Sequence, residues 1–173
     1  MTLEARVIQH LKSKKMILCT IESCTGGLIA HRLTNIPGAS EVFWGSWVVY
    51  DNSAKLRLGV SLQTLKTKGA VSPEVADELA RHGLLSLQQA LDQFPSNSLL
   101  KSNRWIALST TGIAGPSGGT PEKPLGLCFS SITSIEQRPK TLKILAPPQL
   151  DRSQMKNFFA ERALEALLEY DPK

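Results

Sequence analysis

The sequence is poor in the residues from which covalent cross-links and most metal sites are built. Its 173 residues include three cysteines, which is an odd number, and Cys19, Cys24 and Cys128 form no C-x-x-C pair. This pattern argues against a disulfide framework and against a structural zinc site. We therefore expect no metal and no cofactor. The free thiols favour a reducing compartment, and we expect a cytoplasmic protein.

A long apolar run is also missing. No stretch approaches the roughly 18 apolar residues that a membrane-spanning helix needs, and the charged segment 2–15 does not resemble a signal peptide. The net charge is +5, but the densest basic run, at 12–15, holds only three lysines, and aromatic residues make up 6% of the chain. We therefore expect neither a membrane nor a nucleic acid as partner. A small anionic molecule would suit the positive charge.

What the chain does contain is an alternation of strand and helix patterns. Short apolar runs predict strands at 16–21, 43–50, 105–110, 125–132 and 141–145. Helical spacing and capping residues predict helices at 3–11, 28–34, 52–59, 72–90 and 151–167. Asn52 or Ser53 is expected to cap the third helix, Asp151 with Gln154 the last one, and the polar segment 92–103 is expected to be a loop. The order predicts one α/β domain over residues 1–173, a three-layer α/β/α sandwich with a mixed sheet.

The first candidate site is the segment 22–27, Glu-Ser-Cys-Thr-Gly-Gly, which joins a predicted strand to a predicted helix. Such a turn lies at the carboxyl edge of a sheet, where ligands bind in open α/β folds, and the helix N-terminus offers N–H groups to an anion. Ser23 is the candidate nucleophile; alternatively, Ser23 and Thr25 only cap the helix. Cys24 is a rival, but a cysteine hydrolase usually needs a histidine base, and no histidine motif accompanies it.

Two further segments carry candidate chemistry. Lys55 follows a predicted strand and can act as a base if burial lowers its pKa; an ordinary exposed lysine is the alternative. The glycine-rich segment 111–119 lets the backbone approach an anion, although a surface loop is an alternative for 117–123. Neither a Ser-His-Asp triad nor paired carboxylates are visible, so a serine–lysine pair is the best hydrolytic arrangement available.

At these segments the chain resembles the C-terminal domain of CinA, the competence-damage-inducible family, which includes stand-alone nicotinamide mononucleotide deamidases of the PncC type. Four stretches carry the resemblance, which spans nearly the whole chain. They are 22–28, 50–55 with 58–60, 69–72, and 111–116 with 118–119 and 123–124. The chain looks like the stand-alone form of this family.

The resemblance implies a serine–lysine amidohydrolase that converts nicotinamide mononucleotide into nicotinic acid mononucleotide and ammonia, a step in pyridine nucleotide recycling. By position, Ser23 matches the nucleophile, Lys55 the base and Tyr50 an active-site tyrosine. The expected substrate-binding residues are Thr25, Gly26, Thr111, Gly112, Gly115 and Arg152. A homodimer is a further expectation from the family.

The chain departs from the family pattern at Ser46, Asp51 and Leu150, and two of these departures bear on the chemistry. Asp51 would raise the pKa of the nearby Lys55 ammonium group, and Leu150 would alter the approach to Arg152. The competing hypothesis is therefore a catalytically inactive nucleotide-binding or interaction module of the same fold.

Overall fold

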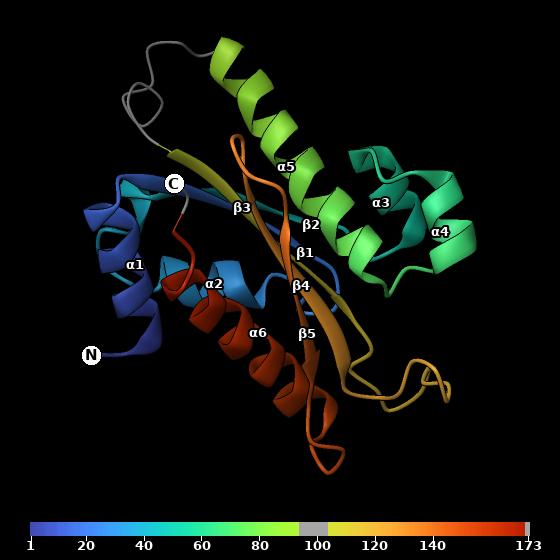
Figure 1. The fold of residues 1–173 in the computed structure, drawn as a ribbon. Coiled ribbons are helices and arrows are strands. Elements are labelled where there is room, and N and C mark those ends of the chain that lie inside the picture. The colour runs from blue at the N-terminus through green and yellow to red at the C-terminus, as the bar shows by residue number, and fades with distance from the viewer. Residues whose placement is uncertain (94–103, 172–173) are drawn as a thin grey trace.

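A computed structural model describes residues 1–93 and 104–171, which form a mixed five-stranded sheet between two layers of helices (Figure 1). The strands lie in the order β2-β1-β3-β4-β5. They are β1 (Met16–Glu22), β2 (Phe43–Val48), β3 (Arg104–Gly112), β4 (Leu127–Ser134) and β5 (Lys140–Leu145). Strands β2, β1 and β3 are parallel, whereas β4 is antiparallel to β3 and β5 to β4. The predicted α/β/α sandwich with a mixed sheet is confirmed.

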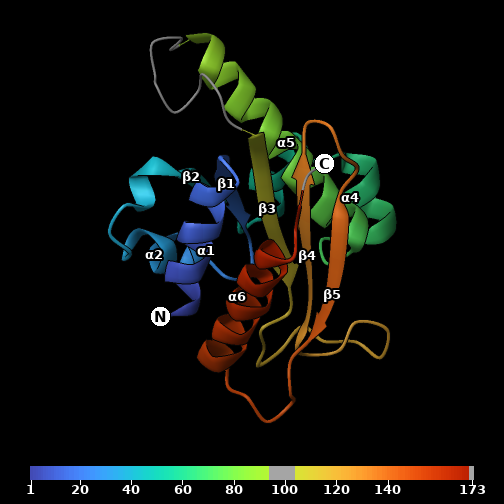
Figure 2. The same ribbon diagram turned by 60° about the vertical axis from the view of Figure 1, so that its left-hand side comes forward.

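The helices divide between the two faces of the sheet. Helices α1 (Leu3–Ser13), α2 (Leu28–Thr34) and α6 (Arg152–Leu168) lie on one face, and α5 (Pro73–Gln93) lies on the other with α3 (Asn52–Leu58) and α4 (Leu62–Lys68) beside it (Figures 1 and 2). Strand β1 supports both layers because its side chains alternate. Met16 and Leu18 pack into the core under α1 and α6, while Ile17, Cys19 and Ile21 pack under α5. None of the described helices is long and apolar enough to cross a membrane.

Several predicted boundaries differ from the structure. Asp51, and neither Asn52 nor Ser53, caps α3, because its carboxylate accepts from the Ser53 backbone N–H at 2.8 Å. Helix α4 occupies a stretch for which the sequence yielded no prediction. Helix α5 continues to Gln93, so two residues predicted as loop are helical; the remaining residues of that prediction, 94–103, lie outside the described part. The capping box between Asp151 and Gln154 is confirmed.

The topology determines where a site can form. The three parallel strands end at the same edge of the sheet, at Glu22, Val48 and Gly112. Strands β1 and β3 are neighbours there, and the chain leaves β1 toward β2 on the other side. Ligands of open α/β sheets bind at such a change of direction, outside the carboxyl ends of the strands.

Candidate active site

A cavity of about 240 Å³ lies at this edge. Most of the predicted site residues line it. They come from the end of β3, from the segments that follow the three parallel strands, from α3 and from the first turn of α6. These residues are Ser23, Tyr50, Lys55, Thr111, Gly112, Gly115 and Arg152. A larger hollow of about 440 Å³ lies between α5 and the β4–β5 turn, at the opposite edge of the sheet and away from these residues.

Ser23 directly follows β1 and is held by the sheet. Its backbone N–H donates to the carbonyl of Thr110 at 3.0 Å, which continues the pairing of β1 with β3. The residue is 7% exposed and lines the cavity. Gly26 and Gly27 adopt φ values of +63° and +89°, which let the chain turn sharply into α2. The Ser23 hydroxyl makes no hydrogen bond to any group in the described residues, so it is available to a ligand.

The N-terminus of α2 is capped by the buried carboxylate of Glu22. Its two oxygens accept from the backbone N–H groups of Ile29, at 3.1 Å, and Ala30, at 2.8 Å. One of them also accepts from the Thr25 hydroxyl at 2.7 Å. The alternative that Ser23 and Thr25 cap this helix is therefore wrong, because Glu22 satisfies the free N–H groups.

Two predicted substrate contacts do not line the cavity. Thr25 is fully buried, and its hydroxyl is shared between Glu22 and the Thr110 hydroxyl, which is 2.8 Å away. Gly26 is exposed beside α6, where an added Cβ would lie 3.4 Å from Nζ of Lys156. Both residues shape the turn that presents Ser23, and neither faces the cavity with it.

Lys55 is buried, with 2% of its surface exposed. Its Nζ donates a hydrogen bond of 2.8 Å to the backbone carbonyl of Tyr50. Burial lowers the pKa of this ammonium group, because the charged form loses hydration; the nearby Asp51 carboxylate raises the pKa, as expected from the sequence, but burial outweighs it. The alternative of an ordinary exposed helix lysine is wrong.

Arg152 connects two sides of the cavity mouth. One guanidinium nitrogen, Nη2, donates to the phenolic oxygen of Tyr50 at 2.5 Å, and Nη1 donates to the carbonyl of Gly115. Tyr50 is 59% exposed, so its ring lies at the rim of the site. Asp151 caps α6 and thereby fixes the backbone of the turn that carries the arginine.

The end of β3 and the following segment form another wall. We call residues 113–126, between β3 and β4, the glycine loop. Its two ends are hydrogen-bonded to each other. The Ile113 N–H donates to the carbonyl of Leu127 at 2.8 Å, and the Gly126 N–H donates to the carbonyl of Ile113 at 2.9 Å. The Thr111 hydroxyl donates to the carbonyl of Ala70 at 2.7 Å, which joins β3 to the turn between α4 and α5. As expected, the loop is exposed at 116–122, whereas Ala114 is buried.

Sequence reasoning missed several residues of this site. Asn52 and the turn residues Ala70 and Val71 line the cavity. The sequence indicates Asn52 as a helix cap and places all three in stretches that carry the family resemblance, but it singles out none of them as a site residue. Cys128 was noted only in the cysteine count, yet its sulfur lies 3.7 Å from that of Cys24. Burial and the hydrogen bond with Cys24 raise the pKa of the Cys128 thiol well above its usual value.

The surroundings of Cys24 disfavour it as a nucleophile. The residue is 5% exposed and packs in an apolar cluster with Cys128 and Phe159. No histidine lines the described cavity, so a thiolate there has no imidazole base. Among the residues that the structure describes, no group of three His, Cys, Asp or Glu side chains could hold a metal ion.

Comparison with known proteins identifies the domain. The sequence model of the CinA C-terminal domain matches residues 1–170. CinA-like proteins of Chloroherpeton thalassium and Chlorobaculum tepidum are each 42% identical over 171 residues, covering 98% and 96% of this chain. The chain spans 37% of the length of each of these two relatives.

Solved structures agree with the sequence comparison. The competence/damage inducible protein CihA from Agrobacterium tumefaciens is 33% identical with a TM-score of 0.82, covering 97% of this chain and 94% of that one. A CinA superfamily protein from Klebsiella pneumoniae is 27% identical with a TM-score of 0.81, covering 96% and 94%. The fold, the family match and the relatives agree, and the chain belongs to the CinA C-terminal domain family.

Proposed function

We propose that this domain hydrolyses the carboxamide of nicotinamide mononucleotide to nicotinic acid mononucleotide and ammonia. One observation carries the proposal. An unpartnered serine hydroxyl at the end of β1 shares a cavity with a buried lysine whose pKa is lowered by burial. A lysine that can lose its proton is the base that a serine nucleophile needs in the absence of a Ser-His-Asp triad.

The reaction is acyl transfer in two stages. Oγ of Ser23 attacks the carboxamide carbon while neutral Lys55 accepts the hydroxyl proton. Lys55 then returns this proton to the leaving nitrogen, so that ammonia departs and a nicotinoyl ester remains on Ser23. Water attacks the ester with Lys55 again as base, which releases the acid and restores the serine.

The oxyanion formed in both stages requires hydrogen-bond donors. Cys24 and Ala114 line the cavity, and their backbone N–H groups donate to no acceptor in the described part of the chain. We assign them to the oxyanion; a donor of this type is typically worth about 3 kcal/mol in the transition state. In the substrate, the positive charge of the pyridinium ring withdraws electrons from the carboxamide and favours attack.

The phosphate of the nucleotide fits the mouth of the cavity. Arg152 uses two of its N–H groups for Tyr50 and Gly115, and a guanidinium has five, so donors remain for a phosphate. Lys156 lies one turn further along α6 and lines, with Arg152, a hollow of about 350 Å³. Two cations beside the N-terminus of a helix suit an anionic group.

Ammonia release tests this proposal directly. The purified domain should release ammonia from nicotinamide mononucleotide with a kcat/KM at least about 100-fold higher than from nicotinamide riboside or free nicotinamide, because a charged hydrogen-bonded contact is lost without the phosphate. A chelator should leave the rate unchanged. Equal efficiency on the riboside would refute phosphate recognition. Tight binding of the mononucleotide without ammonia release would favour the inactive binding module.

A further inference from the structure

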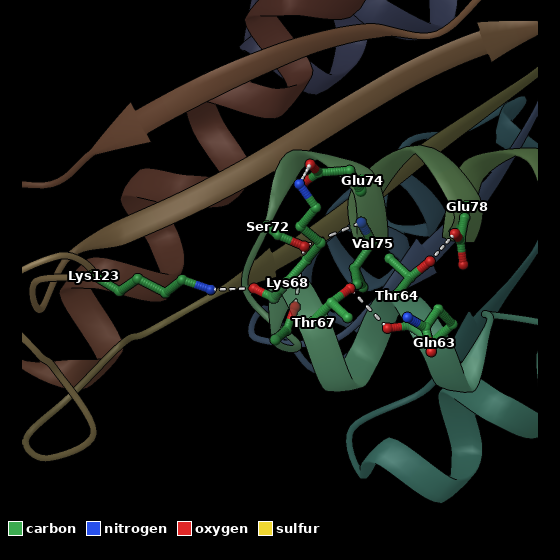
Figure 3. A network of polar contacts seen from close by, with 10 residues as sticks. Gln63, Thr64, Thr67, Lys68, Ser72, Glu74, Val75, Glu78 and Lys123 are labelled. Carbon is green, nitrogen blue, oxygen red and sulfur yellow. Dashed lines mark hydrogen bonds and ion pairs between the residues drawn. The ribbon is translucent and has the colours of Figure 1, made fainter.

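Lys123 of the glycine loop donates a hydrogen bond from Nζ to the backbone carbonyl of Lys68, at the C-terminal end of α4 (Figure 3). The two residues are 55 positions apart in the chain. The Lys68 side chain points elsewhere and pairs with the Glu74 carboxylate of α5 at 3.0 Å. Lys123 therefore joins the glycine loop to α4 through a main-chain acceptor.

The local structure is built to receive this lysine. Gly69 follows with φ +75°, and an added Cβ at this position would lie 3.0 Å from Nζ of Lys123. Lys123 itself is held in a tight turn, since its N–H and carbonyl both bond to Thr120, at 3.1 and 2.8 Å. The carbonyls at a helix C-terminus carry partial negative charge, which favours a cation there.

Both partners of this contact belong to segments that line the active-site cavity. Ala70 and Val71 come directly after the α4 cap, and Ser117 and Gly118 belong to the glycine loop. The turn after Gly69 is fixed to the start of α5. The Ser72 hydroxyl donates to the Gly69 carbonyl at 3.0 Å and accepts from the Val75 N–H at 3.3 Å (Figure 3). The loop, in contrast, is exposed at 116–122. Lys123 thus connects the exposed glycine loop to the fixed turn between α4 and α5.

We propose that Lys123 is a positioning residue, which holds the glycine loop against the α4–α5 turn and so sets the width of the substrate cavity. This inference rests on the proposed function, but Lys123 itself does not line the cavity. Its loss should weaken substrate binding and spare the chemical step. Ser23 and Lys55 are held by β1 and α3, and the oxyanion donor Ala114 lies at the paired end of the loop, next to Ile113.

Steady-state kinetics on nicotinamide mononucleotide test the inference. Lys123→Met should raise KM about tenfold and change kcat by less than threefold, and Lys123→Arg, which keeps a cationic donor of similar reach, should restore KM to within threefold. Lys66→Met is the matched control, since it removes an exposed lysine from α4, the helix that Lys123 contacts. Lys68→Met should have little effect because the acceptor is a backbone carbonyl.

A second measurement does not depend on catalysis. Amide hydrogen exchange of 113–126 should be faster in Lys123→Met than in the parent protein, and the Lys66→Met and Lys123→Arg proteins should match the parent. If the parent releases no ammonia, the proposed function fails, and exchange still decides the role of Lys123 in the loop. Lys123→Gln replaces the methionine variant if that protein does not fold.

The inference is overturned if exchange and KM of a folded Lys123→Met or Lys123→Gln protein equal those of the parent. It is also overturned if kcat falls while KM stays constant, since Lys123 would then affect the chemical step. It is overturned as well if Lys68→Met shows the same raised KM and faster exchange, since the ion pair of Lys68 with Glu74 would then hold the turn.

Discussion

The phenolic oxygen of Tyr50 accepts a 2.5 Å hydrogen bond from Nη2 of Arg152, a residue 102 positions later in the chain. Tyr50 follows the edge strand β2, and Arg152 is the first residue of α6, so the contact joins the segment after β2 to the start of α6. The carbonyl of Gly115 accepts from the same guanidinium. Arg152 therefore has a defined orientation at the cavity mouth before any substrate binds.

Tyr50→Phe should raise KM for nicotinamide mononucleotide about fivefold, with kcat changed by less than threefold. The substitution removes one of the two acceptors that orient Arg152. A hydrogen bond to a charged group contributes about 1.5–3 kcal/mol, part of which the substrate can recover. Arg152→Lys should raise KM further, and the two substitutions should be less than additive in the double variant. A 100-fold loss in kcat for Tyr50→Phe would instead place the phenol in the chemical step.

Glu22→Gln should lower the free energy of unfolding by about 2 kcal/mol, because an amide replaces one acceptor oxygen by a donor and leaves buried groups unpaired. Chemical denaturation monitored by circular dichroism measures this. Glu41→Gln is the matched control: Glu41 forms an exposed ion pair with Lys12 at 2.7 Å, and such pairs contribute about 0–1 kcal/mol. Equal stability of the Glu22→Gln protein and the parent would show that the carboxylate is not needed as a cap.

Lys55→Arg separates a base from a fixed positive charge. Arginine keeps the charge, but its pKa is too high for it to accept a proton from Ser23. Turnover should fall by about 10²–10⁴-fold, the usual contribution of general base catalysis. Thermal unfolding must be recorded with the rate, since Lys55 is buried and arginine is larger. Near-normal turnover in a folded Lys55→Arg protein would exclude the base role.

The lowered pKa of Lys55 predicts a pH dependence of both rate and stability. The rate should rise with pH and level off below 10.5, once pH exceeds the pKa of Lys55 in the folded protein. Between that pKa and 10.5 the unfolded chain binds more protons, so the free energy of unfolding should rise with pH across this window. Lys55→Met removes this pH dependence of the free energy of unfolding. Its stability relative to the parent should be greatest below the window, where the parent buries a charged ammonium group. If the difference in free energy of unfolding between Lys55→Met and the parent does not change with pH up to 10.5, the pKa of Lys55 is not lowered.

The fold was predictable because local patterns and burial agree. Strand β1 is apolar at nearly every position and is buried on both faces, as a central parallel strand must be. The last helix was predicted from its cap and from the apolar spacing of Met155, Phe159 and Ala163, all of which are buried. Helix α4 was missed because none of its residues is buried, so it has no apolar stripe.

The candidate site was predictable where a residue directly follows a strand. Ser23, Thr111 and Gly112 lie at the ends of β1 and β3, so topology brings them together. Thr25 was expected to contact the substrate. Whether its hydroxyl faces the cavity depends on the long-range bond to Thr110, which no local pattern reveals. The Lys123 contact depends on the same kind of long-range geometry.

Replacing each of the two adjacent nucleophile candidates with alanine decides which side chain attacks the carboxamide. Ammonia release from nicotinamide mononucleotide should be abolished in Ser23→Ala, because the hydroxyl of this cavity-lining residue is lost. Cys24→Ala should keep most of the activity, since its thiol is buried against Cys128. Both proteins should be folded by circular dichroism. An active Ser23→Ala protein together with an inactive Cys24→Ala protein would contradict the account and assign the nucleophile to the thiol.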